Sequence, residues 1–327
     1  MSSVKSYSPR HYPPYGHMVI EWEKLTLPPK TPPGDWDGKI DYGVWLDSIA
    51  RLLSKILWPR YVRADHAWKG AARKIMHDLT MTDFRLIQAL RLKIDEDAGI
   101  SSRNITHKEL FFIEDEVLLD KGPHISLKIY LSGKASDDII DKLSEGYLSG
   151  VSSKCGMVDL DVKVDMQRPR AYQMAWLLDR EGFTYEHAKS AVSPSMISGH
   201  CIETLTGGVA AYPHARDMGC SQDALDALAR HTVDIGDRRV FAGVHYPSDN
   251  ISSWLTGLLL YPHVAPDDDG AGWLWQAIWT HSSVYRAIMD EVKVNPSSPY
   301  RRSMSLLAAV GAGEIMTVDA ALASVAK

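Results

Sequence analysis

The sequence has few cysteines, no long apolar run and no excess of positive charge. The cysteines are three, Cys155, Cys201 and Cys220, and none lies in a Cys-x-x-Cys or Cys/His ligand spacing. An odd number without that spacing argues against a disulfide framework and against a zinc module. Lys and Arg number 36 against 41 Asp and Glu, a net charge of −5. Because nucleic acids and anionic membranes select strongly basic surfaces, we expect neither as a partner.

The sequence also lacks segments that would direct it to a membrane. The first 19 residues, MSSVKSYSPRHYPPYGHMV, hold no continuous apolar stretch of the kind that a signal peptide needs. No later stretch reaches the roughly 18 apolar residues of a membrane helix. We therefore expect a soluble, cytoplasmic protein with no transmembrane segment. With 45% apolar residues, a chain of 327 residues can bury one sizeable core.

The spacing of apolar residues predicts an all-α fold with at most short minor strands. Prolines mark residues 1–40 as an irregular arm on the body, and residues 41–327 are expected to form a single helical domain. Apolar residues three and four apart, from Val44 to Leu57, predict a helix that ends before Pro59. A capping box at Thr106 and Glu109 predicts another, ending near Gly122. Further helices are expected over 66–78, 82–95, 136–149, 172–190, 200–212, 221–235, 248–260, 271–292 and 301–325, and alternating apolar residues favour short strands at 125–131 and 160–164.

A histidine and an acid lie four residues apart at the start of one predicted helix. Pro247 suits the first position of a helix, which places His245 just before that helix. Asp249 then falls in the first turn, where its carboxylate can accept a hydrogen bond from one ring nitrogen of His245. The other nitrogen is left to attack or to bind a ligand. The alternative is a surface histidine beside an ordinary first-turn acid.

A second group, Ser198-Gly199-His200, precedes an apolar helical stretch. Serine is a strong N-cap, and glycine lets a ligand approach the backbone closely. Such a helix start can present a hydroxyl and backbone N–H groups to an anion, with His200 at the edge. The alternative is a capped helix with a histidine nearby.

Cations supply the third feature. Lys163 precedes Arg168 by five residues and Arg170 by seven, and Arg239 lies six residues before His245. Residues seven apart share a helical face, but Pro169 interrupts any helix here, so geometry alone leaves the choice between the two arginines open. The alternative is a solvated charged loop.

Taken together, the three groups resemble a known signature. The order Lys-x6-Arg, Ser-Gly-His and Arg-x5-His-x3-Asp is similar to that of the superfamily uniting type 2 phosphatidic-acid phosphatases, bacterial class A acid phosphatases and vanadium-dependent haloperoxidases. The family's first motif often reads Arg-x-Arg, with the lysine seven residues before the second arginine, which selects Arg170 over Arg168. The matched motifs, within 163–249, cover about the middle quarter of the chain. The matched positions are Lys163, Arg170, Ser198, Gly199, His200, Arg239, His245 and Asp249.

Three positions depart from the family pattern. Ala171 and Ile197 stand where the family has prolines, and Arg238 stands where it has a serine. None of these changes removes a charged or catalytic group. They put the local loop geometry in doubt and indicate an outlying branch with an altered substrate preference.

The resemblance implies a multi-helix bundle and a metal-independent phosphatase. His245 would attack phosphorus and form a phosphohistidine, Asp249 would orient it, and His200 would protonate the leaving alcohol. The anion would be bound by Lys163, Arg170, Arg239, Ser198 and Gly199. The expected substrate is a phosphomonoester or diphosphate of a small or lipid-like alcohol.

The same residues leave two other functions open. A vanadium-dependent haloperoxidase would hold vanadate on His245 as its cofactor and oxidise halide with peroxide, whereas the phosphatase needs no cofactor. The His245-Tyr-Pro-Ser-Asp249 version of the motif favours the phosphatase, since many haloperoxidases read His-Trp or His-Phe-Arg-Phe-Asp there. Ser193 favours it as well, since several haloperoxidases carry an aromatic residue or a second histidine at that position. The third possibility is an inactive helical interaction protein with a residual anion site. The partners expected are a small phosphorylated substrate or inorganic phosphate or vanadate, and the sequence leaves a homo-oligomer open.

Overall fold

The computed structural model describes residues 30–62, 67–68, 72–97, 124–178, 180, 193–265 and 270–326. In these ranges the chain is helical apart from one antiparallel pair of two-residue strands, β1 (Tyr61–Val62) and β2 (Ala67–Trp68). The all-α class with minor strands is confirmed for the described residues, although the strands lie at neither of the two predicted places. The helices are α2 (Tyr42–Ile56), α3 (Ala72–Asp97), α6 (His124–Leu131), α7 (Asp137–Gly150), the π-helical turn η3 (Val151–Cys155), α8 (Val158–Met166), α9 (Ala171–Leu177), α10 (Gly199–Asp217), α11 (Gln222–Phe241), α12 (Pro247–Val264), α13 (Gly270–His281), α14 (Ser283–Val294), α15 (Arg301–Gly311) and α16 (Val318–Ser324).

Helix α12 is the centre of the bundle. Every residue from Pro247 to Tyr261 is buried, and the helix packs against α3, α10, α11, α13, α14 and α15. Its polar side chains are small, and their hydroxyls bond back to the helix: Ser252 Oγ donates to Asp249 O at 2.7 Å, and Thr256 Oγ1 to Ser252 O at 2.7 Å. The buried hydroxyls are thereby satisfied, so a helix with polar residues can lie inside an apolar core.

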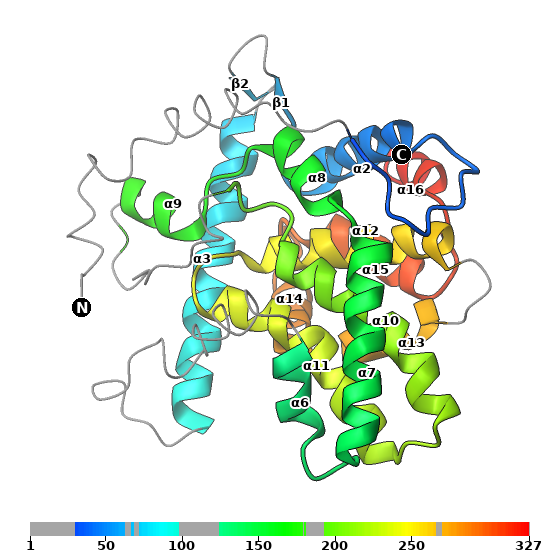
Figure 1. Ribbon diagram of the computed structural model, residues 1–327. Coiled ribbons are helices and arrows are strands. Elements are labelled where there is room, and N and C mark those ends of the chain that lie inside the picture. The colour runs from blue at the N-terminus through cyan, green and yellow to red at the C-terminus, as the bar shows by residue number, and fades with distance from the viewer. Residues whose placement is uncertain are drawn as a thin grey trace.

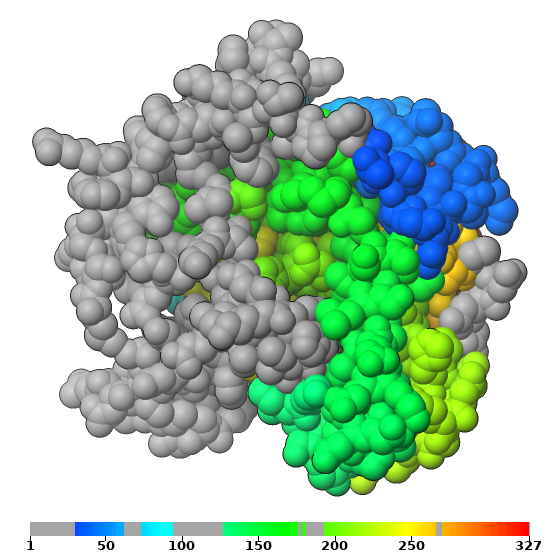
Figure 2. Space-filling model, in the orientation of Figure 1, coloured from blue at the N-terminus to red at the C-terminus, as the bar shows by residue number. Residues whose placement is uncertain are grey.

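Six helices, α3, α10, α11, α13, α14 and α15, pack around α12, and α6, α7 and α9 lie farther from it (Figure 1). A continuous apolar core joins α2 and α3 to the C-terminal helices α12–α16, and a second, smaller cluster lies beneath α6, α7, α10 and α11. Helix α2 packs against α16, which brings the first described helix and the last one together. On the face shown in Figure 2, α7 and α8 reach the surface beside residues of α2.

Residues 30–40 are irregular and lie on the helical body. The Asp35 N–H donates to Ser153 O at 3.0 Å, and the Asp37 N–H to His263 O at 2.8 Å. The Trp36 ring stacks on the His263 ring with 4.7 Å between centroids. Backbone bonds and one aromatic stack therefore fix this part of the predicted arm, whereas residues 1–29 lie outside the described residues.

The predicted first helix is confirmed as α2, with Asp41 as its N-cap. Both predicted strands, 125–131 and 160–164, are wrong, because the chain forms α6 and α8 there. In α6 the buried residues Leu127 and Leu131 are four apart, and Ile129 is 58% exposed on the opposite face. Apolar residues on both faces of one short helix had produced a strand-like alternation.

Other boundaries also differ from the predictions. The predicted helices 66–78 and 82–95 are one helix, α3, which begins at Ala72 after the strand pair. The predicted helix 271–292 is divided at Ser282, which caps α14 by accepting a bond from the Tyr285 N–H. The predicted helix 301–325 is divided near Gly313, whose φ of +74° ends α15. The prediction at 106–122, and that at 172–190 beyond α9, lie outside the described residues.

Within the part of the chain that the structure describes, no helix is both long and apolar enough to cross a membrane.

Candidate functional site

The start of α12 fixes the His245 ring. Pro247 is the first residue of the helix, and the Asp249 carboxylate accepts the Tyr246 N–H at 3.0 Å through Oδ2. The same oxygen lies 3.0 Å from His245 Nδ1, the contact that the sequence predicted. On the other side of the ring, Arg170 Nη1 lies 2.7 Å from His245 Nε2. A guanidinium can only donate, so Nε2 is the acceptor and the ring proton is on Nδ1, donated to Asp249.

Arg170 is itself held in place by the chain on both sides. Its Nε donates to Ser193 O at 2.7 Å, its Nη2 to Ser193 Oγ at 3.1 Å, and its Nη1 to Val244 O at 3.1 Å. The side chain is 1% exposed. These bonds hold the guanidinium so that Nη1 donates to the Nε2 lone pair of His245, which places a cation directly beside a nucleophilic nitrogen.

Arg168 points to the opposite side of the histidine–aspartate pair. Its Nη1 donates to Asp249 Oδ1 at 2.9 Å, and its Nη2 to Asp83 Oδ2 on α3 at 2.7 Å, and all three side chains are fully buried. The guanidinium carbon lies 3.8 Å from the centre of the Tyr246 ring. Arg168 therefore pairs with two buried carboxylates and steadies the acid that orients His245.

Lys163 lies against the first turn of α10. Its ammonium is buried and pairs with Asp159 Oδ2 at 2.7 Å, one turn earlier in α8. A Cβ placed on Gly199 would come within 2.6 Å of that carboxylate oxygen and 3.4 Å of Lys163 Nζ. The missing side chain of Gly199 is thus what lets the ion pair approach the start of α10.

Ser198 is the N-cap of α10, as predicted. Its Oγ accepts the Cys201 N–H at 3.4 Å, and its own N–H donates to Ser253 Oγ of α12 at 3.0 Å. The hydroxyl accepts this capping bond, and its own proton is available for a further acceptor. The cap also ties the start of α10 to the first turns of α12.

His200 and Arg239 complete the group. Burial first, and then the charges of Arg239, His245, Lys163 and Arg170, hold the pKa of His200 well below its usual value. The same cations act on His245, where burial again is the main cause and Arg170 has the largest charge effect on the lowered pKa. Both histidines therefore respond to the same three cations, so the structure brings together residues from α8, α10, α11, α12 and the 167–170 loop.

Arg238, the first arginine of its pair, is directed elsewhere. Its Nε donates to Asp234 Oδ2 at 3.1 Å, and its Nη2 to the Tyr130 hydroxyl at 2.8 Å. Adjacent residues of a helix point about 100° apart, so Arg239 faces the histidines while Arg238 joins α11 to α6. The departure of Arg238 from the family pattern therefore falls on a residue whose bonds serve the packing of two helices.

The sequence did not indicate several residues of this site. Asp83 accepts bonds from Arg168, from the Ser248 N–H at 3.0 Å and from the Tyr300 hydroxyl at 2.5 Å. These partners lie 85, 165 and 217 residues away along the chain, a separation that leaves no local signal. Asp159, by contrast, is four residues from Lys163, and that spacing could have indicated the ion pair.

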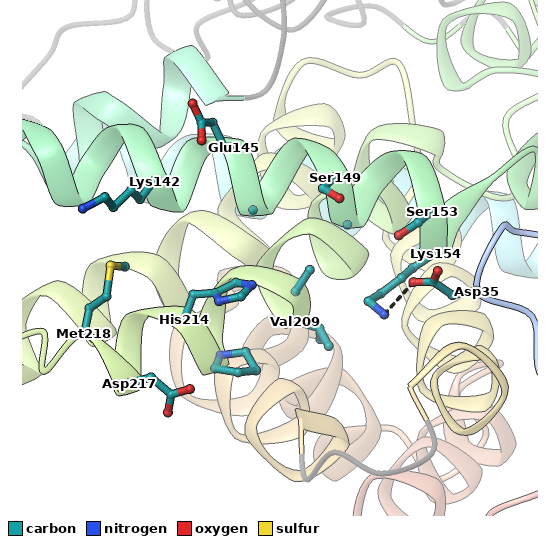
Figure 3. Close-up of a pocket in the computed structure, with 14 residues that line it drawn as sticks. Asp35, Lys142, Glu145, Ser149, Ser153, Lys154, Val209, His214, Asp217 and Met218 are labelled. Carbon is teal, nitrogen blue, oxygen red and sulfur yellow. Dashed lines mark hydrogen bonds and ion pairs between the residues drawn. The ribbon is translucent and has the colours of Figure 1, made fainter.

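A separate pocket lies away from these residues. It has a volume of about 820 Å³ and lies between α7 and α10, with Lys142, Glu145, His214 and Asp217 lining one end (Figure 3). At its other end Lys154 pairs with Asp35 at 3.0 Å. None of the eight predicted site residues lines it. The described residues also hold no group of three or more His, Cys, Asp or Glu side chains placed to bind a metal ion.

Comparison with known proteins leaves the geometry as the guide to function. No family model, no curated protein and no solved structure matches the chain. The arrangement itself has definite chemical abilities: a neutral imidazole with one nitrogen directed by a carboxylate, a second imidazole nearby, and three cations whose charges reach both. Such a site suits an oxyanion and a nucleophilic attack on it.

Proposed function

We propose that the protein is a phosphatase of the acid phosphatase and vanadium haloperoxidase superfamily, and that it hydrolyses a phosphate ester through a phosphohistidine on His245. The main support is the His245 ring, whose Nδ1 proton is donated to Asp249 and whose Nε2 faces Arg170 at 2.7 Å. This tautomer keeps the proton off Nε2, whose lone pair accepts the Arg170 bond. When the substrate binds, the guanidinium transfers that bond to a phosphoryl oxygen, and the Nε2 lone pair becomes the nucleophile.

The first step forms a nitrogen–phosphorus bond and breaks the bond between phosphorus and the alcohol oxygen. His245 Nε2 attacks phosphorus, and His200 gives its proton to the departing alkoxide. Lys163, Arg170 and Arg239, with the Ser198 hydroxyl and the Gly199 N–H, offset the charge on the three equatorial oxygens. Asp249 stabilises the positive charge that the imidazole gains.

The second step returns the enzyme to its starting form. His200, now neutral, takes a proton from water, the resulting hydroxide attacks phosphorus, and the nitrogen–phosphorus bond breaks to release inorganic phosphate. The buried ion pairs of Arg168 with Asp249 and Asp83 hold the acid in place through both steps. Arg168 is thus a positioning residue in this mechanism.

Substrate binding also prepares His200 to act as an acid. Burial first, and then the cations, hold the pKa of His200 well below its usual value, so the free enzyme keeps it neutral near pH 7. A bound phosphate dianion offsets those charges and raises the pKa of His200, which then takes up the proton that the leaving group needs. Protonation of the acid is therefore coupled to the presence of the substrate.

One experiment separates this function from its two alternatives. Hydrolysis of p-nitrophenyl phosphate is measured with and without vanadate, beside vanadate-supported bromination by peroxide. Hydrolysis that vanadate inhibits supports the phosphatase. Vanadate-dependent bromination with little hydrolysis would instead make it a haloperoxidase, and a folded protein inactive in both assays would favour the interaction protein.

A further inference from the structure

Glu203 is a carboxyl group at the cation cluster that the proposed reaction does not use. It lies four residues after Gly199 on α10, and residues four apart share a face of a helix. Helical side chains tilt toward the N-terminus, so Glu203 reaches back toward Gly199. There the Asp159 carboxylate and the Lys163 ammonium lie directly over the Gly199 backbone. This geometry directs the Glu203 carboxyl toward the Asp159–Lys163 pair.

The charges around Glu203 agree with this placement. Burial raises the pKa of Glu203 to about 7, the negative charge of Asp159 adds to that effect, and Lys163 and Arg239 oppose it. An ordinary surface glutamate would show neither the burial nor the response to two of the three anion-binding cations.

Glu203 is also the helical neighbour of His200, the proposed acid. It follows His200 by three residues, so the two side chains are neighbours on the helix surface. Both are half-buried, whereas Lys163, Arg170 and His245 are 4%, 1% and 1% exposed. In the proposed reaction His200 touches the leaving oxygen, which brings the first atoms of the alcohol within reach of its neighbour Glu203.

We infer that Glu203 is a specificity-determining residue, which selects phosphomonoesters whose alcohol carries hydrogen-bond donors, an ammonium group or hydroxyls, close to the ester oxygen. This inference rests on the proposed function. A carboxylate accepts bonds from such groups, gives nothing to an alkyl chain and repels a second anion. The Glu203 carboxylate therefore disfavours diphosphates and other esters whose leaving group is anionic, although Lys163, Arg170 and Arg239 alone would favour such substrates.

The test compares four small substrates that share the phosphate. They are phosphoethanolamine, glycerol 1-phosphate, propyl phosphate and 3-phosphoglycerate, and kcat/KM is measured for each at about pH 8, where Glu203 is ionised. We expect the ammonium and hydroxyl substrates to exceed propyl phosphate by roughly tenfold, the usual effect of a hydrogen bond to a charged group, and 3-phosphoglycerate to be the poorest. The substitution Glu203→Gln, which keeps the shape and removes the charge, should bring the ratio of phosphoethanolamine to propyl phosphate close to one.

A matched control lies on the same helix. Asp217 ends α10 and its side chain is 73% exposed, so Asp217→Asn changes the net charge equally and should preserve the substrate ratios. A measurement on the unaltered protein avoids any folding defect: between about pH 8 and pH 6 the preference for phosphoethanolamine should fall as Glu203 gains a proton. The titratable and charged groups near Glu203 are Asp159, Lys163 and Arg239 and, from α7 and η3, Tyr147 and Cys155. His200 is its neighbour one turn earlier on α10. Their effect on the common phosphate cancels in the ratio to propyl phosphate.

Different results test the role of Glu203 and the proposed phosphatase activity. Hydrolysis of all four substrates at similar rates, or ratios unchanged by Glu203→Gln, would overturn the role of Glu203 and leave the phosphatase intact. Absence of hydrolysis for every phosphate ester would overturn the phosphatase itself.

Discussion

Removal of Arg168 and removal of Arg170 should have different effects, the first on the stability of the fold and the second on anion binding. Arg168→Ala leaves Asp83 and Asp249 as buried carboxylates without the cation that both of them contact, at 2.7 and 2.9 Å. Removing one partner from a buried ion pair costs about 3–5 kcal/mol of unfolding free energy. Arg170→Ala removes a cation that contacts the His245 Nε2 and two backbone carbonyls. Its main effect should be on anion binding, weakened by about 10–100-fold, because charge-assisted bonds to the anion are lost.

Urea unfolding and calorimetric binding of inorganic phosphate measure the two effects separately. Arg168→Ala should lose stability and, while folded, bind phosphate within about tenfold of the unaltered protein. Adding Asp83→Asn to Arg168→Ala should recover part of the lost stability, because one unpaired charge is removed, and the coupling energy between these two sites should exceed about 1 kcal/mol. If folded Arg168→Ala loses phosphate affinity more than Arg170→Ala does, the wrong arginine has been placed at the anion.

Three further predictions concern the site and the core. Gly199→Ala should weaken phosphate binding by at least about tenfold, because its Cβ would lie 2.6 Å from Asp159 Oδ2 and force the Asp159–Lys163 pair apart. The control Gly272→Ala, whose Cβ would have no atom within 4 Å, should bind phosphate normally. Equal phosphate affinity of the two variants in calorimetry would contradict this account. His231 is fully buried, and burial lowers its pKa to about 3, so the folded state binds no proton where the unfolded state does. The free energy of unfolding should therefore fall by up to about 5 kcal/mol as pH drops from about 6.5 to about 3. Urea unfolding of His231→Phe should show a smaller fall over the same pH range. An equal dependence of the unfolding free energy on pH in both proteins would count against this explanation. Finally, histidine NMR should show that the pKa of His200 rises when phosphate binds. An unchanged or lower pKa would contradict the proposed charge coupling between His200 and the bound phosphate.

The parts of the fold that the sequence predicted well have local causes. The first helix follows from the apolar spacing between Val44 and Leu57, and the starts of α10 and α12 follow from Ser198 and Pro247, each of which acts on the turn that it begins. The His245–Asp249 contact belongs to the same class, since its two members lie four residues apart at one helix start. Short-range rules of capping and spacing are sufficient for all of these features.

The errors arise where tertiary packing decides. Residues 124–131 alternate like a strand, but burial of Leu127 and Leu131 against the second core cluster makes them a helix. The role of Arg168 could not be read from its neighbours, because Asp83 lies 85 residues away on α3. Spacing alone left Arg168 and Arg170 equivalent, whereas in the folded chain one contacts the acid and the other the histidine.

The glycine of the Ser-Gly-His group has both a local and a tertiary reason. The sequence suggested that Gly199 lets a ligand approach the backbone. In the structure its missing Cβ leaves room for the Asp159 and Lys163 side chains, which come from a different helix. The two explanations are compatible, because the ammonium that occupies this space is itself one of the cations assigned to the anion.

The central claim is that His245 carries the phosphoryl group during turnover. Rapid quenching of the protein with p-nitrophenyl [³²P]phosphate, followed by peptide mass spectrometry, tests it directly. The mechanism predicts a base-stable, acid-labile phosphoryl adduct on His245 that forms as nitrophenolate is released and is absent from His245→Ala, which should not turn over. Steady hydrolysis by His245→Ala, or a phosphoryl group trapped on any other residue, would contradict it.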